Sequence, residues 1–245
     1  MKLIDAHFHL DFYRDHQFWY SQINAMKQYT LCVTNSPEIY FSCKNLYPET
    51  RYVKFALGYN PQISTSTPLN KQLFLSQLAS TKYIGEVGLD YSAKNISSKR
   101  MQVDAFDFIC HNAAKYNKVL SVHSRKAEKD TLDILTRNKV QRAIIHWYTG
   151  DLETLQLFIQ EGFYFSVNTN MCATAKGQSI IRQIPLERIL VESDGPFTKV
   201  GTQKFTPVNL HQVYSLLSTA TGIPHFDKLV YDNFDSLLRM DESGK

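Results

Sequence analysis

Short apolar, β-branched runs alternate along the chain with longer amphipathic segments. The spacing of the hydrophobic positions changes each time from about two to about 3.6 residues, which is typical of strands that are each followed by a helix. We expect strands at Lys2–His7, Thr30–Thr34, Tyr52–Gly58, Tyr83–Gly88, Val119–His123, Arg142–His146, Phe163–Val167 and Ile189–Glu192.

Amphipathic segments separate the later strands, and two more follow the last strand. The expected helices include Lys71–Ser80, Lys99–Tyr116, Glu128–Arg137, Leu152–Glu161, Ala175–Gln183, Pro207–Thr221 and Phe226–Leu238. Eight strands alternating with helices favour an α/β fold of the (β/α)8 TIM-barrel type, formed as a single domain over residues 1–245. The alternative is a doubly wound sheet, but the chain has ten glycines and no GxGxxG turn after its first strand, which disfavours it.

Composition changes this picture little. Of the 245 residues, 43% are hydrophobic and 20% are charged, as in ordinary globular proteins, and no apolar run approaches the roughly 18 residues of a membrane-spanning helix. The first residues, MKLIDAHFHL, lack the apolar core of a signal peptide. Four scattered cysteines without CxxC spacing predict reduced thiols in a cytoplasmic protein, and the net charge of +4 permits an anionic substrate without requiring one.

Histidines and acids recur where the expected strands end. The residues concerned are His7, His9, Glu86, His123, His146 and Asp194. The carboxyl ends of barrel strands form the face on which such enzymes build their sites, and residues two apart in a strand point to the same side. We therefore expect these side chains to converge on one or two divalent cations, Mg, Mn or Zn, with Asp5 orienting a histidine from outside the ligand set.

Each of these residues taken alone has an ordinary structural explanation. A single HxH pair is weak evidence, a strand-end histidine is more often a packed residue, and Glu86 or Asp194 could cap a helix or form an ion pair. Six possible ligands at the same end of five strands are hard to reconcile with chance. A pair of metals about 3.5–4 Å apart can activate water and stabilise the leaving oxygen, so the set points to metal-assisted hydrolysis.

Five sequence blocks, in order, resemble the TatD family of metal-dependent deoxyribonucleases, which belongs to the amidohydrolase-like barrels. These blocks are DAHFHLD, GEVGLDY, VHSRKA, IIHWYTG and ESDGP, and the likeness extends over essentially the whole chain. The resemblance implies that one metal is held by His7, His9, Glu86 and Asp194, and a second by Glu86, His123 and His146. It also implies that Asp194 orients or deprotonates the attacking water, with Glu86 bridging the metals, and that Arg125 faces a substrate phosphate.

Three blocks depart from the family pattern. The family's GxHP block reads Gly58-Tyr59-Asn60-Pro61, so that Asn60, which cannot carry a proton near neutral pH, replaces a histidine. The HCFSG-like block reads HWYTG, and the TDAP-like block reads SDGP. We assign Asn60, Trp147 and Tyr148 to substrate binding. The HWYTG block resembles TatD-like nucleases of anti-phage defence clusters of the Qat type, in which protein partners from the same operon would be expected.

Three functions compete at this point. The first is a two-metal DNase that acts on DNA single strands or ends, with cationic groups such as Lys199 and Lys204 near the phosphates. The second is an amidohydrolase acting on a C–N or ester bond of a small molecule; such enzymes often place a carboxylated lysine where this chain has Glu86. The third is a non-catalytic member that binds nucleic acid, against which the complete set of ligands argues.

Overall fold

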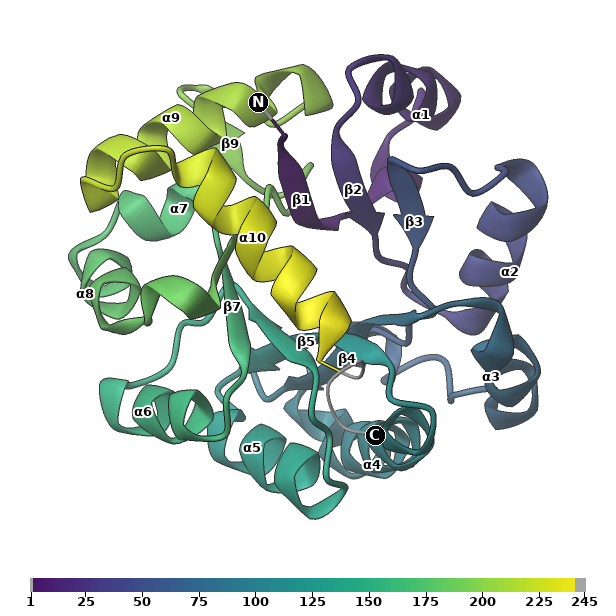
Figure 1. Ribbon diagram of the computed structural model, residues 1–245. Helices are drawn as coiled ribbons and strands as arrows, with labels where there is room; N and C mark the ends of the chain where they lie inside the picture. Colours follow the sequence, from purple (N-terminus) through teal and green to yellow (C-terminus); the bar gives the residue numbers. More distant parts are fainter. Residues whose placement is uncertain (1, 241–245) are drawn as a thin grey trace. The chain divides into compact units, whose positions relative to one another are not determined.

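The computed structural model describes residues 2–240. Along this part of the chain, eight strands alternate with helices, and a short antiparallel pair follows the eighth strand (Figure 1). The strands are β1 (Ile4–Phe8), β2 (Tyr29–Cys32), β3 (Val53–Phe55), β4 (Tyr83–Asp90), β5 (Val119–Arg125), β6 (Ala143–His146), β7 (Tyr164–Val167), β8 (Ile189–Val191), β9 (Lys199–Val200) and β10 (Gln203–Lys204). Each of β1 to β8 overlaps an expected strand.

The helices fill the intervals between the strands. They are α1 (His16–Ala25), α2 (Pro37–Leu46), α3 (Lys71–Gln77), α4 (Lys99–Lys115), α5 (Glu128–Arg137), α6 (Leu152–Gln160), α7 (Thr169–Cys172), α8 (Ala175–Gln183), α9 (Leu210–Thr221) and α10 (Phe226–Arg239). The helix α2 begins where the local chemistry favours it, because the Ser36 side chain accepts a hydrogen bond from the Ile39 N–H and Pro37 occupies the first turn.

The chain forms two compact units, which we describe separately. The first comprises residues 2–32, 49–54 and 165–240, and the second comprises residues 33–48 and 55–164. In the first unit, β1 pairs in parallel with β2 (Figure 1). The strand β7 pairs in parallel with β8. The end of β1 is joined to the segment after β8 by backbone hydrogen bonds, so that the two strand ends meet.

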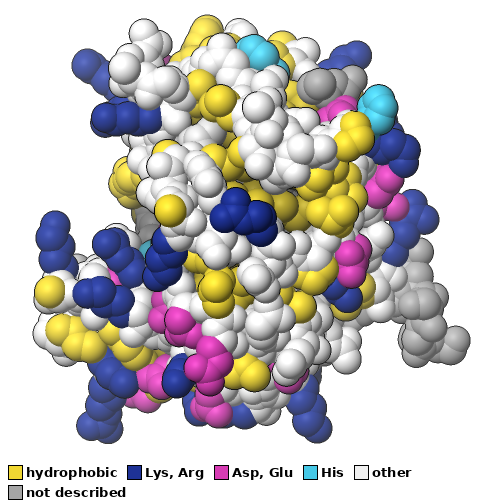
Figure 2. Space-filling view, turned by 90° about the vertical axis from the view of Figure 1, so that its left-hand side faces the viewer, with side chains coloured by type: hydrophobic (Ala, Val, Ile, Leu, Met, Phe, Trp, Pro, Cys, Tyr) yellow, Lys and Arg dark blue, Asp and Glu magenta, His cyan; other side chains and the backbone are white. Residues whose placement is uncertain are grey.

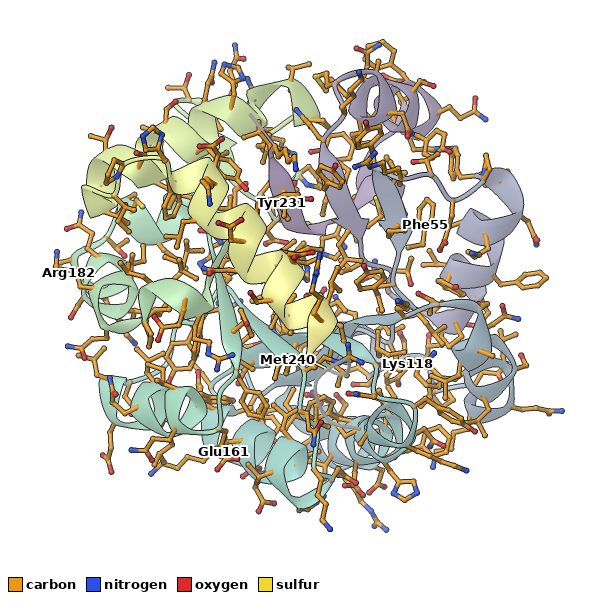
Figure 3. All side chains as sticks on the ribbon, viewed as in Figure 1. Phe55, Lys118, Glu161, Arg182, Tyr231 and Met240 are labelled. Atoms are coloured by element: carbon orange, nitrogen blue, oxygen red, sulfur yellow. The ribbon has the colours of Figure 1, made fainter. Side chains whose placement is uncertain are left out.

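Two C-terminal helices close the first unit around β1 and β8. The Tyr214 hydroxyl on α9 donates to the Ile4 carbonyl and accepts from the Ile4 N–H, at 2.8 and 2.9 Å. On α10, the Asn233 amide donates to the carbonyls of Leu186 and Ile189, just before and at the start of β8. Tyr231, labelled in Figure 3, lies on the same helix with its ring centroid 5.8 Å from that of Tyr29 on β2. These contacts fix the amino ends of the strands and leave their carboxyl ends for the site.

In the second unit, β4, β5 and β6 pair in parallel in chain order. All eight residues of β4 are buried, in keeping with a sequence that is largely apolar apart from the two acids Glu86 and Asp90. Gly88 lies opposite His123 with φ +137°, and a Cβ there would stand 2.0 Å from the His123 carbonyl oxygen. Only glycine permits this close approach of the two strands. Lys118, labelled in Figure 3, donates to the Thr81 carbonyl beneath the same strands.

The distribution of charged side chains on the surface agrees with the small net charge of the chain. Lys and Arg side chains are spread over the face drawn in Figure 2, with Asp and Glu side chains between some of them, and do not gather into one band there. On this face (Figure 2), the small excess of positive charge therefore does not mark a polyanion-binding surface. Within residues 2–240, every helix is too short or too polar to cross a bilayer. The four cysteines are thiols, three of them buried.

Candidate metal centre

The first cluster lies where β1 and β8 end, in the first unit. The Nε2 atoms of His7 and His9 are 3.1 Å apart, and they lie 3.6 and 3.5 Å from the Asp194 Oδ1. All three side chains are buried, with His7 fully inaccessible. Two imidazole nitrogens and a carboxylate oxygen therefore converge on one point, as the HxH spacing at the end of the first strand predicts.

Backbone hydrogen bonds hold this cluster in register. The Asp194 N–H donates to the His7 carbonyl and the His9 N–H donates to the Gly195 carbonyl, both at 3.0 Å. Asp194 adopts a left-handed conformation with φ +47°, which is uncommon for a residue with a side chain and turns its carboxylate toward the histidines. Gly195 follows because a Cβ there would stand 2.7 Å from the Tyr13 hydroxyl oxygen and 2.4 Å from the Phe205 ring. The turn is therefore built around the position of Asp194.

Asp5 stabilises the same turn through hydrogen bonds to Ser193. Its carboxylate accepts hydrogen bonds from the Ser193 N–H at 2.8 Å and from the Ser193 hydroxyl at 2.5 Å. Burial raises the pKa of Asp5 to about 7, although these hydrogen bonds favour the ionised form. Its strongest partners are thus groups of Ser193, the residue before Asp194, and not an imidazole ring. The expectation that Asp5 orients a histidine is therefore replaced by a role in shaping the turn.

The second cluster lies at the ends of β4, β5 and β6, in the second unit. The Glu86 Oε1 is 2.8 Å from the His123 Nδ1 and 3.1 Å from the His146 Nε2, and these two nitrogens are 3.1 Å apart. Glu86 and His146 are buried and His123 is nearly so. Trp147, directly after His146, has φ +39°, a strained conformation for a bulky residue of the kind that accumulates at functional sites.

Asp90 orients His123 from behind. Its Oδ2 lies 3.3 Å from the His123 Nε2, which leaves the Nδ1 directed at Glu86. The carboxylate is fully buried and also accepts from the Gln62 amide at 3.1 Å and the Ser92 N–H at 2.8 Å. A carboxylate behind a histidine is the usual support of a metal-binding imidazole. The sequence reasoning missed Asp90, although the residue stands in the GEVGLDY block.

Asn60 holds the other oxygen of Glu86. Its amide nitrogen donates to the Glu86 Oε2 at 2.6 Å and to the Asn35 Oδ1 at 2.9 Å, while its oxygen accepts from the Gln62 N–H at 2.9 Å. Both N–H groups and the oxygen are thus engaged within the protein. Asn60 therefore positions Glu86 in this structure, and its expected role in substrate binding stays a prediction.

The protonation of the second cluster follows from its contacts. Burial works against ionisation of Glu86, but hydrogen bonds and charge from His123 and His146 outweigh it and hold the pKa of Glu86 well below its usual range. Burial likewise favours neutral His123, but the carboxylates of Asp90 and Glu86 outweigh it and raise the pKa of His123. The cluster is therefore an anionic carboxylate facing an imidazole that readily takes a positive charge.

Both clusters fit a divalent cation. Ligand atoms 2.1–2.2 Å from one ion, at angles of about 80–110°, stand about 2.7–3.6 Å from each other. The separations are 3.1–3.6 Å in the first cluster and 2.8–3.1 Å in the second. Neutral imidazoles with one carboxylate are also a common donor set for zinc and related ions. Each cluster could therefore hold one ion, and the bridging of both ions by Glu86 stays a prediction.

The remaining predicted site residues lie in different surroundings. Arg125, at the end of β5, is exposed, as a phosphate-binding role requires. Trp147 is half-buried, whereas Tyr148 is 1% exposed and donates from its hydroxyl to the Asp151 carbonyl. Its ring packs edge-to-face against Phe158. Tyr148 therefore offers no ring face to a substrate in this conformation. The sequence shows an aromatic residue at this position but not how deeply it is buried.

Comparison with known proteins decides the family. A sequence profile of the family described as "TatD related DNase" matches residues 4–239. The chain belongs to the TatD family. It is 27% identical to the uncharacterized metal-dependent hydrolase YcfH of Escherichia coli K12, over 99% of this chain and 98% of YcfH. The uncharacterized metal-dependent hydrolase BU355 of Buchnera aphidicola is 28% identical over 80% of this chain and 82% of its own length.

A comparison with solved structures settles the fold. The crystal structure of YJJV, a TatD homologue from Escherichia coli K12, matches with a TM-score of 0.82 and 21% identity, over 96% of this chain and 97% of YJJV. The expected (β/α)8 TIM-barrel class is thereby confirmed. This TatD chain is a metal-dependent hydrolase with clustered His, Asp and Glu side chains able to bind metal.

Proposed function

We propose that this TatD chain hydrolyses phosphodiester bonds of DNA, single strands or strand ends in particular, with two divalent cations, Mg, Mn or Zn. The observation that carries the proposal is the pair of three-residue clusters, each with ligand separations suited to one ion. The DNase description of the family supports the substrate. Cations of this kind, when bound, lower the pKa of a coordinated water and stabilise negative charge on phosphoryl oxygens.

The residues of the chain would divide the work as follows. His7 and His9 with Asp194 would hold one ion, and Glu86 with His123 and His146 would hold the other. The Asp194 carboxylate would accept the proton of the attacking water, for which its position beside the two histidines is suitable. The exposed Arg125 guanidinium would bind a phosphate oxygen, since its planar donor array matches that geometry.

The small-molecule amidohydrolase remains the alternative. Its C–N or ester chemistry could use the same histidines and aspartate, but the residue on β4 is Glu86, held by Asn60, in place of a lysine. The expected anti-phage role, protein partners and cytoplasmic location stay predictions, supported only by the sequence blocks and by the thiol state of the cysteines.

A nuclease assay tests the proposal. Purified full-length protein is incubated with labelled single-stranded, blunt duplex and overhang DNA, in Mg, Mn or Zn and with a chelator. We expect chelator-sensitive cleavage, fastest on single strands or overhangs. The Glu86→Gln variant serves as the matched inactive control, because it keeps the shape of the side chain while removing its charge. Failure to cut any DNA with any of the three metals, alongside full metal occupancy, would refute the assignment.

A further inference from the structure

Two phenylalanines stand half-exposed beside the first cluster. Phe12 and Phe197 are 50% and 51% exposed, and their ring centroids are 5.0 Å apart. Each ring also meets His9 edge-to-face, with centroid distances of 5.4 and 5.3 Å. Both rings cover the His9 imidazole on one side and present aromatic surface to solvent on the other.

Backbone contacts tie both rings to the ligand residues. The Phe12 N–H donates to the His9 carbonyl at 3.3 Å, and the Phe197 N–H donates to the Asp194 carbonyl at 2.8 Å. The backbone of both phenylalanines is therefore held beside the cluster, and the ring contacts with His9 and with each other place the side chains there. An exposed aromatic pair next to a candidate hydrolytic site is a suitable surface for a planar group of the substrate.

The hairpin that follows Phe197 supplies positive charge. Lys199 on β9 lies directly opposite Lys204 on β10, and both are exposed. Neither ammonium makes an ion pair with any residue between 2 and 240. Like charges directly across a strand pair repel each other, so this pairing is unfavourable unless an anion lies between or over them. The Lys199 carbonyl accepts from the Thr169 hydroxyl at 2.9 Å, which anchors the hairpin to α7.

We propose that Phe12, Phe197, Lys199 and Lys204 form a subsite for single-stranded nucleic acid, in which an unpaired base stacks on the phenylalanine rings and a backbone phosphate lies at the lysines. The proposal rests on the DNase function proposed above and names the feature that selects unpaired strands. A base inside a duplex keeps its faces against its neighbours, so only an unpaired base can offer one to these rings. The lysines contribute the part of binding that does not depend on sequence.

Binding in the presence of a chelator tests the subsite without cleavage. Fluorescence anisotropy measures the Kd of the full-length protein for labelled dT12, for an abasic strand of the same length, and for a blunt duplex. Wild type should bind dT12 at least tenfold more tightly than the abasic strand or the duplex. The double variant Phe12→Leu with Phe197→Leu keeps apolar bulk but loses the flat rings, and it should bind dT12 about tenfold more weakly, leaving the abasic strand unchanged.

The controls use residues of matched exposure. Phe18, 52% exposed on α1 of the same unit, is changed to Leu, and exposed Lys27 is changed to Gln; neither change should alter the Kd for dT12. The double variant Lys199→Gln with Lys204→Gln should bind all three probes more weakly. For the single strands, the slope of log Kd against log salt concentration should fall by about 0.7 for each phosphate that is no longer neutralised. Thermal melting of each variant excludes unfolding as the cause.

The outcomes separate this proposal from the one before it. If the phenylalanine variant binds dT12 within twofold of wild type, or if wild type does not prefer dT12, the subsite is wrong even where DNA is cleaved. If dT12 binding depends on the rings but no DNA is cut under any metal, the subsite stands and the nuclease proposal fails.

Discussion

Replacing Asp90 by asparagine should weaken metal binding at the second cluster alone. The carboxylate accepts a hydrogen bond from the His123 Nε2–H, so that the Nδ1 lone pair faces Glu86 and any bound ion. Asparagine has the same shape, and its oxygen can still accept from the Ser92 N–H. Its amide nitrogen then faces the imidazole and donates to Nε2, which favours the tautomer with a proton on Nδ1. That tautomer cannot bind metal through Nδ1.

The structure limits the size of the effect. Asp90 is fully buried, so solvent cannot take over the role of its carboxylate, yet it touches only one of three ligands in its cluster. Losing such a support typically costs 10–100-fold in metal affinity, or about 1.4–2.7 kcal/mol. The fold should survive, since the Gln102 side-chain oxygen still accepts from the residue 90 N–H at 2.7 Å and its amide nitrogen donates to the residue 90 carbonyl at 2.9 Å.

Isothermal titration of the metal-free protein with Zn²⁺ or Mn²⁺ measures both sites in one experiment. The first cluster serves as an internal standard, because Asp90 supports none of its ligands. Asp130→Asn is the control for the change of charge: Asp130 also lies in the second unit and accepts from the Tyr91 hydroxyl at 2.8 Å, but it is partly exposed and touches no residue of the cluster. Equal weakening at both sites, or a change below twofold at the second, would contradict the tautomer argument.

Three further expectations follow from other parts of the molecule. Arg125→Ala should raise KM or lower kcat for DNA cleavage at unchanged metal content, measured by steady-state kinetics and metal analysis; loss of metal would make Arg125 structural instead. Tyr214→Phe should cost about 1–3 kcal/mol in unfolding free energy, because the Ile4 N–H and carbonyl lose their buried partner, and chemical denaturation that finds no loss would contradict this. Asp90 and Glu86 outweigh burial and raise the pKa of His123, so protons compete with metal at a higher pH than for an ordinary imidazole. The metal affinity of the second cluster should therefore rise with pH and flatten once His123 is neutral. Titrations from pH 6 to 8.5 that show a constant affinity would exclude that competition.

Much of the fold could be predicted from the spacing of hydrophobic residues along the chain alone. The expected helix Glu128–Arg137 matches α5, and the expected strand Arg142–His146 differs from β6 by one residue. The helix is amphipathic and all four residues of the strand are buried, so local preference and burial agree. The expected strand Tyr52–Gly58 is longer than β3, which ends at Phe55, because the following residues turn toward Asn60 and bridge only at Leu57. The spacing of hydrophobic residues predicts the presence of a helix or strand more accurately than it predicts the residue at which that element ends.

The two candidate metal clusters could be predicted from the sequence, whereas the residues that support them could not. Strand ends bring His7, His9 and Asp194 together in one unit, and Glu86, His123 and His146 in the other, because parallel strands share a carboxyl edge. Asp90, however, reaches the ring of a residue that lies opposite Gly88 and not opposite itself, and that diagonal depends on a register which the sequence does not contain. The exposure of aromatic side chains could not be predicted for a similar reason: Tyr148, which we assigned to substrate binding, is buried, and half-exposed Phe12 was not singled out.

Asn60 shows how a departure from the family pattern can preserve the site while changing its response to pH. A histidine at this position would titrate near neutrality and would donate a charged hydrogen bond to Glu86 only below its pKa. The Asn60 amide donates at every pH, so that the Glu86 Oε2 stays fixed and the Oε1 stays directed at His123 and His146. Proton competition at the second cluster is then left to its own imidazoles. The substitution therefore removes one titrating group beside the ligands without removing the hydrogen bond that positions them.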